Sequence, residues 1–87
     1  MDVVGERYPD AYIVKIQQGY YSTRGIPDVM VILDGHYFGF EVKKPYFGVR
    51  SDLQKKTIKD INRSGGTAAF VSYPQEAIDI IEAYLSK

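Results

Sequence analysis

Two acidic side chains and a lysine occur at a spacing that would bring them together on one β-hairpin. Asp28 follows Gly25-Ile26-Pro27, and Glu41 and Lys43 lie further along the chain. The Asp34-Gly35 pair between two apolar runs is typical of a two-residue hairpin loop, because a type I′ turn needs positive φ at both central residues. With this loop Asp28 faces Glu41, and Lys43 shares a face with Glu41 since strand side chains alternate.

A second register is compatible with the same residues. A three-residue loop over Asp34, Gly35 and His36 would shift the pairing by one position and make the carboxylates diagonal or opposite-facing neighbours. Both registers bring the two strand segments next to each other. Two carboxylates and an ammonium would then stand in an otherwise apolar sheet, which is costly unless the charges are paired or hold a metal.

This group of residues could hydrolyse a phosphodiester. Carboxylate oxygens are ligands for Mg²⁺ or Mn²⁺, so Asp28 and Glu41 are candidate metal ligands, with the Val42 carbonyl as a third. Lys43 could orient or help deprotonate a metal-bound water and offset charge that develops at phosphorus. Taken singly, each residue also has a structural interpretation, with Asp28 capping the turn and Glu41 and Lys43 forming a solvent-facing ion pair on an edge strand.

The rest of the chain predicts one α/β domain over 1–87. We expect a mixed sheet of about four strands flanked by helices, in the order (α)βββαβα. The hairpin should lie mid-sheet because its strands carry apolar residues on both faces. A helical crossover between the third and fourth strands implies a parallel pair there. The expected elements are a short or frayed helix over 1–8, strands over 11–17, 27–33, 37–43 and 67–72, and helices over 51–64 and from 74 onward.

The two later helices have clear sequence signals. Ser51 and Gln54 fit a capping box at the start of the first. Its expected apolar stripe is Leu53, Thr57, Ile58 and Ile61. In the last helix the apolar face is Ala77, Ile78, Ile81, Tyr84 and Leu85, while Gln75, Asp79 and Glu82 are expected to face water.

Charge is unevenly distributed although the net charge is zero. The segment 43–63 has seven basic and two acidic residues, a net charge of +5, which is either an ordinary solvated helix face or a surface for a nucleic-acid backbone. Candidate DNA-binding residues are Lys15, Lys44, Arg50, Lys55, Lys56 and Lys59.

Composition excludes several classes of protein. The chain has no cysteine and one histidine, so disulfide frameworks and thiolate or multi-imidazole zinc sites are excluded. No segment has the composition of a signal peptide or the length of a membrane span, so we expect a cytoplasmic protein that does not bind membranes.

The ordered set Gly-x-Pro-Asp28, Glu41-Val42-Lys43, helical Gln54 and Gly65-Gly66 before a last strand resembles the virus-type replication-repair nuclease (VRR-NUC) domain. That family belongs to the PD-(D/E)xK nucleases, which have a restriction-endonuclease-like fold. The resemblance implies Asp28 and Glu41 as metal ligands, Lys43 as the catalytic lysine and Gln54 near the active site. Many members carry a metal-binding glutamate on an N-terminal helix, and Glu6 is the residue placed to match it.

Compact members of this family resemble Holliday junction resolvases and act as dimers on branched DNA. The implied function is a Mg²⁺- or Mn²⁺-dependent endonuclease in a bacterial or phage-infected cell. Two other functions remain open, a non-catalytic DNA-binding module and a protein-interaction module on the same fold. Aromatic residues in the expected loops could form a dimer surface, stack on bases or pack locally; they are Tyr20, Tyr21, Tyr46 and Phe47.

Overall fold

The computed structural model describes residues 2–16, 26–45 and 50–87. Within these ranges the elements follow the expected order, and the α/β class with a four-stranded mixed sheet is confirmed. They are α1 (Asp2–Arg7), β1 (Tyr12–Lys15), β2 (Val29–Leu33), β3 (His36–Val42), α2 (Asp52–Arg63), β4 (Thr67–Val71) and α3 (Pro74–Leu85). The tyrosines and phenylalanine expected in loops, at positions 20, 21, 46 and 47, lie outside the described residues.

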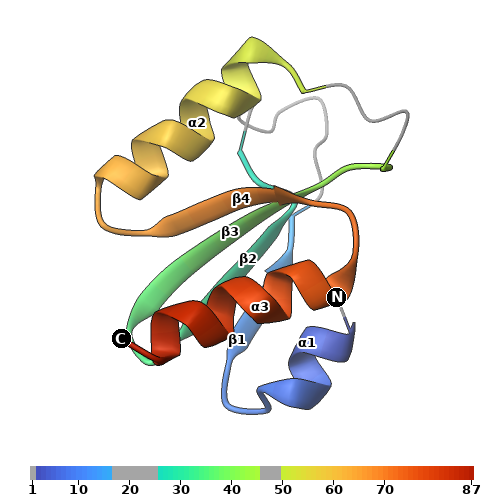
Figure 1. Ribbon diagram of the computed structural model, residues 1–87, viewed down its shortest axis with the longest axis vertical. Helices are drawn as coiled ribbons and strands as arrows, with labels where there is room; N and C mark the ends of the chain where they lie inside the picture. Colours follow the sequence, from blue (N-terminus) through green and yellow to red (C-terminus); the bar gives the residue numbers. More distant parts are fainter. Residues whose placement is uncertain (1, 17–25, 46–49) are drawn as a thin grey trace.

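The sheet has the strand order β1-β2-β3-β4, so the β2–β3 hairpin is central as expected (Figure 1). The β1–β2 and β2–β3 pairs are antiparallel, whereas β3 and β4 are parallel. α2 provides the crossover that a parallel pair requires.

The hairpin loop consists of two residues. Asp34 and Gly35 have φ values of 54° and 76°, and Leu33 pairs with His36 across the turn. Glycine tolerates positive φ without strain and aspartate is among the residues that adopt it most readily, which explains the type I′ turn. The three-residue loop is therefore wrong, and His36 is the first residue of β3 rather than part of the turn.

The hydrophobic core lies between one face of the sheet and helices α1 and α3. Phe38, Phe40 and Val31 of the hairpin are fully buried. Figure 1 shows α1 and α3 on the same side of the sheet, where Val4 and Ile81 complete this core. Four of the ten buried core residues in the described part of the chain come from β2 and β3, so the hairpin is packed into the core at the middle of the sheet.

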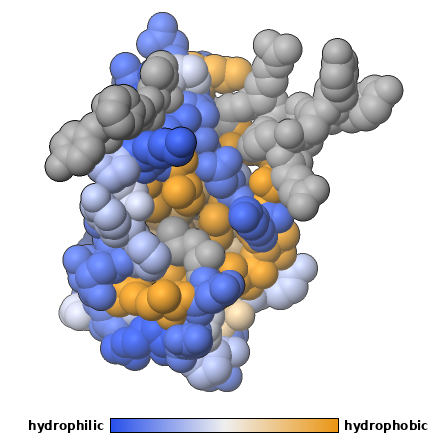
Figure 2. All heavy atoms as spheres, turned by 90° about the vertical axis from the view of Figure 1, so that its right-hand side faces the viewer, coloured by the Kyte–Doolittle hydropathy of each residue, from blue (hydrophilic) through white to orange (hydrophobic). Residues whose placement is uncertain are grey.

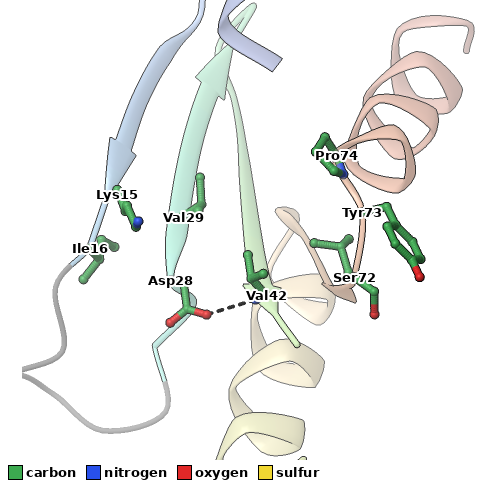
Figure 3. Close-up of a pocket in the computed structure, with 9 residues that line it drawn as sticks. Lys15, Ile16, Asp28, Val29, Val42, Ser72, Tyr73 and Pro74 are labelled. Atoms are coloured by element: carbon green, nitrogen blue, oxygen red, sulfur yellow. Dashed lines mark hydrogen bonds between the residues drawn. The ribbon is translucent and has the colours of Figure 1, made fainter. Parts of the chain in front are cut away.

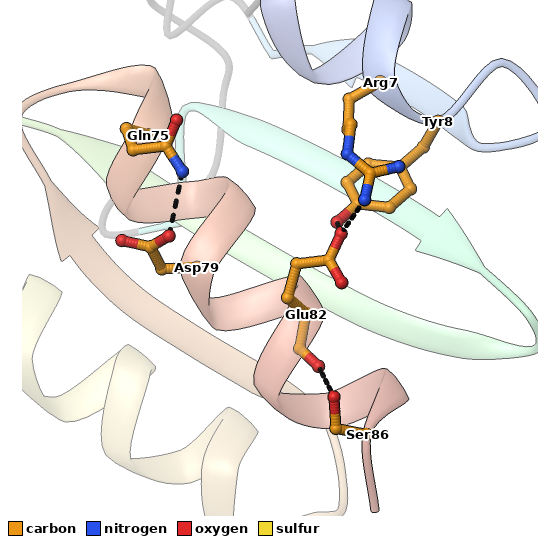
Figure 4. A network of polar contacts seen from close by, with 6 residues as sticks. All are labelled: Arg7, Tyr8, Gln75, Asp79, Glu82 and Ser86. Atoms are coloured by element: carbon orange, nitrogen blue, oxygen red, sulfur yellow. Dashed lines mark hydrogen bonds and ion pairs between the residues drawn. The ribbon is translucent and has the colours of Figure 1, made fainter.

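A polar cluster joins α1 to α3 (Figure 4). The Tyr8 hydroxyl and the Arg7 guanidinium both donate to Glu82 Oε1, at 2.5 Å each. Burial and this hydrogen bond raise the pKa of Tyr8 to about 12. Glu82 was expected to face water, and its side chain is 41% exposed; it also accepts two hydrogen bonds because α1 packs beside α3.

α2 packs beside β4 without burying any residue completely. Thr57, Ile58 and Ile61 are partly buried as the stripe predicts, but Leu53 is 46% exposed because it lies at the start of the helix. The Asn62 side chain donates to Ala68 O and accepts from Ala68 N, at 2.9 and 2.8 Å. The Asn62 side chain therefore satisfies both backbone hydrogen-bonding groups of Ala68 in β4.

Candidate active site

The candidate site lies at the open end of the β2–β3 hairpin. The pairing of Val29 with Phe40, continued by one position, sets Asp28 opposite Glu41. The Val42 amide donates to Asp28 Oδ2 at 2.9 Å, which fixes this carboxylate against β3 just before β2 begins. The tight turn thus determines, through the register, which two carboxylates meet.

Glu41 is buried, with 4% of its surface exposed. Its Oε1 atom accepts a hydrogen bond from Gln54 Nε2 at 2.7 Å and lies 3.6 Å from Lys43 Nζ. Lys43 is itself mostly shielded, with 18% of its side chain exposed. The Lys43 ammonium and the Gln54 side-chain amide therefore converge on one carboxylate oxygen of Glu41.

The second carboxylate oxygen of Glu41 is different. Oε2 is buried and has no hydrogen-bond partner among the described residues. Burial raises the pKa of Glu41, the nearby Asp28 carboxylate raises it further, and Lys43 opposes both effects. A buried carboxylate oxygen without a donor is costly, so this atom is an expected position for a ligand that the protein alone does not supply.

Gln54 is oriented by the first turn of α2. Its backbone amide donates to Ser51 Oγ at 3.1 Å, and its Oε1 accepts from the Ser51 amide at 3.2 Å, which completes the expected capping box. The remaining end of the side-chain amide faces Glu41. Ser51 is thus connected to the site through Gln54, a role that the sequence signal for a helix cap does not reveal.

A pocket of about 280 Å³ adjoins Asp28 (Figure 3). It lies between the ends of β1, β2 and β3 on one side and the start of α3 on the other, with Lys15 at the β1 side and Tyr73 at the α3 side. Its lining residues are Lys15, Ile16, Asp28, Val29, Val42, Val71, Ser72, Tyr73 and Pro74. Sequence reasoning missed this pocket because its walls come from four separate segments.

The basic residues singled out in the sequence are all exposed, and among them Lys15 lines the pocket. Lys44 follows β3, and the Arg50 guanidinium lies 4.7 Å from the centre of the Phe70 ring. Lys55, Lys56 and Lys59 are exposed on α2. The pKa of Asp60 is lowered, first by a hydrogen bond from Lys56, so part of the positive charge of α2 is paired locally.

Figure 2 views the side of the molecule that lies to the right in Figure 1, and shows hydrophobic residues in patches enclosed by hydrophilic ones. This side includes the ends of β3 and β4. Apolar and polar groups are thus available together on this side of the molecule.

Glu6 is exposed on α1, a helix that packs beside α3. Within the described ranges no group of three acidic, histidine or cysteine side chains could hold a metal, so Glu6 does not join Asp28 and Glu41. Asp28, Glu41, Lys43 and Gln54 come together, and Val42 adjoins them through its amide contact with Asp28.

No protein-family model, curated protein or solved structure matches the chain. No helix in the described part of the chain has the length and apolar character needed to cross a membrane.

Proposed function

We propose that this chain is a Mg²⁺- or Mn²⁺-dependent endonuclease of the VRR-NUC type that hydrolyses phosphodiester bonds in branched DNA. The observation that carries the proposal is the convergence of Asp28, Lys43 and Gln54 on the buried Glu41 carboxylate. The group lies at the open end of the hairpin, and its Asp28 lines a pocket, which favours a functional site.

The residues present fit a hard divalent cation. Mg²⁺ is usually held by one or two carboxylates and keeps several waters, and Asp28 with Glu41 meets that requirement. The unpartnered Glu41 Oε2 is the atom that gains most from a cation, because a cation would compensate its buried charge. The Val42 carbonyl is the proposed backbone ligand. When bound, such an ion supplies Lewis acidity toward phosphoryl oxygens and lowers the pKa of water.

The neighbouring side chains have separate roles in this proposal. Lys43 holds positive charge beside Glu41 Oε1 and is available to offset negative charge that develops on the phosphate. Gln54 donates to the same oxygen and so directs the other oxygen of Glu41 toward the ligand. Asp28 is fixed by the Val42 amide, which limits its freedom to turn away.

The exposed cations support contact with a nucleic-acid backbone, and Lys15, Lys44, Arg50, Lys55, Lys56 and Lys59 are the proposed contacts. A homodimer would present two such sites to the two strands of a junction. Tyr12 and Ile32, which pair across β1 and β2 and are 62% and 39% exposed, are apolar surface that a second copy could cover. Sedimentation across a concentration series tests this association.

Cleavage of a labelled four-way junction in Mn²⁺ tests the activity. Asp28→Asn and Lys43→Ala should each lower the rate at least about 100-fold, which is the scale of losing a group that assists proton transfer or stabilises charge. Asp10→Asn and Lys87→Ala, which change exposed residues of the same types, are the matched controls. Equal cleavage by all five proteins, or undiminished cleavage in EDTA, would refute the proposed mechanism.

A non-catalytic DNA-binding module is the second candidate. The observation in its favour is that the described residues bring two carboxylates together and not three. Such a module would bind Mn²⁺ and junction DNA but cleave no branched substrate. A protein-interaction module would show neither cleavage nor salt-dependent DNA binding.

A further inference from the structure

We propose that the pocket beside Asp28 holds an unstacked nucleobase of the strand that is cut, next to the scissile phosphate. The inference rests on the proposed nuclease function and specifies how that site would engage its substrate. Asp28 belongs both to the carboxylate pair and to the pocket wall, whereas Glu41 does not line the pocket. A strand whose phosphate lies at Asp28 would therefore pass the mouth of the pocket, where a neighbouring base could enter.

The floor of the pocket suits a flat, weakly hydrated group. Val42 of β3 lines the space and is 44% exposed, while Val29 and Val71 lie almost completely buried behind it, at 3% and 2%. Ile16 and Pro74 add apolar surface at the two sides. A hydrated ion or a phosphate gains nothing from such a lining, whereas the faces of a nucleobase are removed from water there.

The polar groups of the pocket determine how a bound nucleotide is oriented in it. Lys15 alone is cationic among the lining residues, and it lies at the β1 side. At the α3 side the amides of Ser72 and Tyr73 both donate to Glu76 Oε1, at 2.7 and 2.8 Å. These amides are therefore not available to a phosphate, so the strand's backbone lies toward Lys15 and the base lies toward α3.

Tyr73 provides the stacking surface. It is 56% exposed and lies at the α3 side of the pocket, where Figure 3 shows its ring at the outer edge. Aromatic rings stack on every base and so bind without sequence preference. The Ser72 hydroxyl on the same wall is a donor and acceptor for a base edge.

This arrangement favours branched DNA. Extruding a base from a continuous duplex costs unstacking and unpairing, and the cost is least where the base is already unpaired. Bases at a branch point meet that condition. The pocket would thus select branched substrates by the low cost of freeing one base.

Cleavage of modified junctions tests the pocket. The cut position is mapped with the unchanged protein in Mn²⁺, and the nucleotide on each side of the cut is then replaced in turn by an abasic residue. At one of the two positions the replacement should slow cleavage about tenfold, the scale expected for losing one stacked base. Tyr73→Ala should slow cleavage of the intact junction about tenfold. In this variant the slowing caused by the abasic residue, the abasic penalty, should be less than about twofold, since ring and base act together.

Two variants make the result specific. Tyr73→Phe keeps the ring and should retain the abasic penalty. Leu85→Ala removes a large apolar side chain that is 39% exposed on α3 and does not line the pocket, so it should retain the penalty as well. An abasic penalty that is unchanged in Tyr73→Ala, or absent at both positions, would overturn the pocket proposal while leaving the nuclease proposal intact.

A fluorescence measurement separates the two proposals if no cleavage occurs. The base beside the branch is replaced by 2-aminopurine, and the protein is added in Ca²⁺. A change in fluorescence on binding that is lost in Tyr73→Ala would support a base pocket in a protein that does not hydrolyse DNA. No cleavage and no change that depends on Tyr73 would overturn both proposals.

Discussion

Replacing Glu41 by glutamine should stabilise the metal-free protein at neutral pH. Glu41 is 4% exposed, its Oε2 has no partner among the described residues, and Asp28 lies beside it. A glutamine can still accept from Gln54 and offers an amide donor toward Asp28. The substitution therefore removes a buried charge and keeps the shape of the site.

The size of the effect follows from two opposing contributions. A buried polar group without a partner costs about 1–3 kcal/mol, and a charged one costs more. Loss of the mostly shielded Lys43 pair, at 3.6 Å, opposes this gain and removes more than the roughly 1 kcal/mol of an exposed pair. A net gain of about 1 kcal/mol raises Tm by about 4–8 °C in a domain of this size.

The advantage of glutamine should depend on pH in a defined direction. The pKa of folded Glu41 lies above its usual value of 4.5, mainly because of burial. The charged form therefore destabilises the fold fully above this raised pKa, and the penalty disappears as pH falls to the unfolded value. The difference in Tm between Glu41→Gln and the unchanged protein should shrink between pH 7.5 and 4.5.

Thermal unfolding in EDTA at several pH values measures this difference. Glu76→Gln is the matched control, because Glu76 is an exposed glutamate that caps α3. At about 100 times its Kd, Mn²⁺ should add about 2.7 kcal/mol to the unchanged protein and less to Glu41→Gln. Lower stability of Glu41→Gln at pH 7.5, or a difference that grows toward pH 4.5, would refute the reasoning.

Three further changes test the surroundings of the site. Gly39→Ala should lower the free energy of unfolding in urea by about 1–3 kcal/mol, because an added Cβ would lie 2.8 Å from Pro27 Cγ and 3.0 Å from the Tyr37 ring; an unchanged midpoint would contradict these close contacts. Asn62→Ala should lower the free energy of unfolding by about 1–3 kcal/mol, since both backbone groups of Ala68 lose their hydrogen bonds to the Asn62 side chain. Hydrogen exchange at the Ala68 amide should then accelerate while the β1 amides stay protected. Ser51→Ala should lower the free energy of unfolding by about 1 kcal/mol and alter the pH dependence of cleavage, while Ser51→Thr should restore both. A loss of stability with an unchanged pH profile would show that Ser51 caps the helix without affecting the site.

The local signals in the sequence predicted most of the architecture. The Asp34-Gly35 turn determined the hairpin register, and Ser51 with Pro74 located the starts of two helices. These features depend on a few neighbouring residues, so the sequence contains the information needed to place them. The juxtaposition of Asp28 with Glu41 follows from the same turn.

Features that join distant segments could not be predicted in this way. The Glu82 contacts with Arg7 and Tyr8 depend on how α1 packs against α3. The exposure of Leu53 depends on where α2 extends beyond the sheet, and the pocket depends on four chain segments at once. Periodicity identifies the faces of a helix but not its neighbours.

The short sequence separation of Asp28 and Glu41 has a consequence for folding kinetics. A two-residue turn closes within microseconds, whereas the parallel β3–β4 pair needs the α2 crossover and closes more slowly. We infer that the two carboxylates meet early, while still hydrated, and that Glu41 loses its water when α2 and β4 dock. Glu41→Gln should therefore accelerate the docking step in stopped-flow refolding, and an effect confined to the unfolding rate would place desolvation after the transition state.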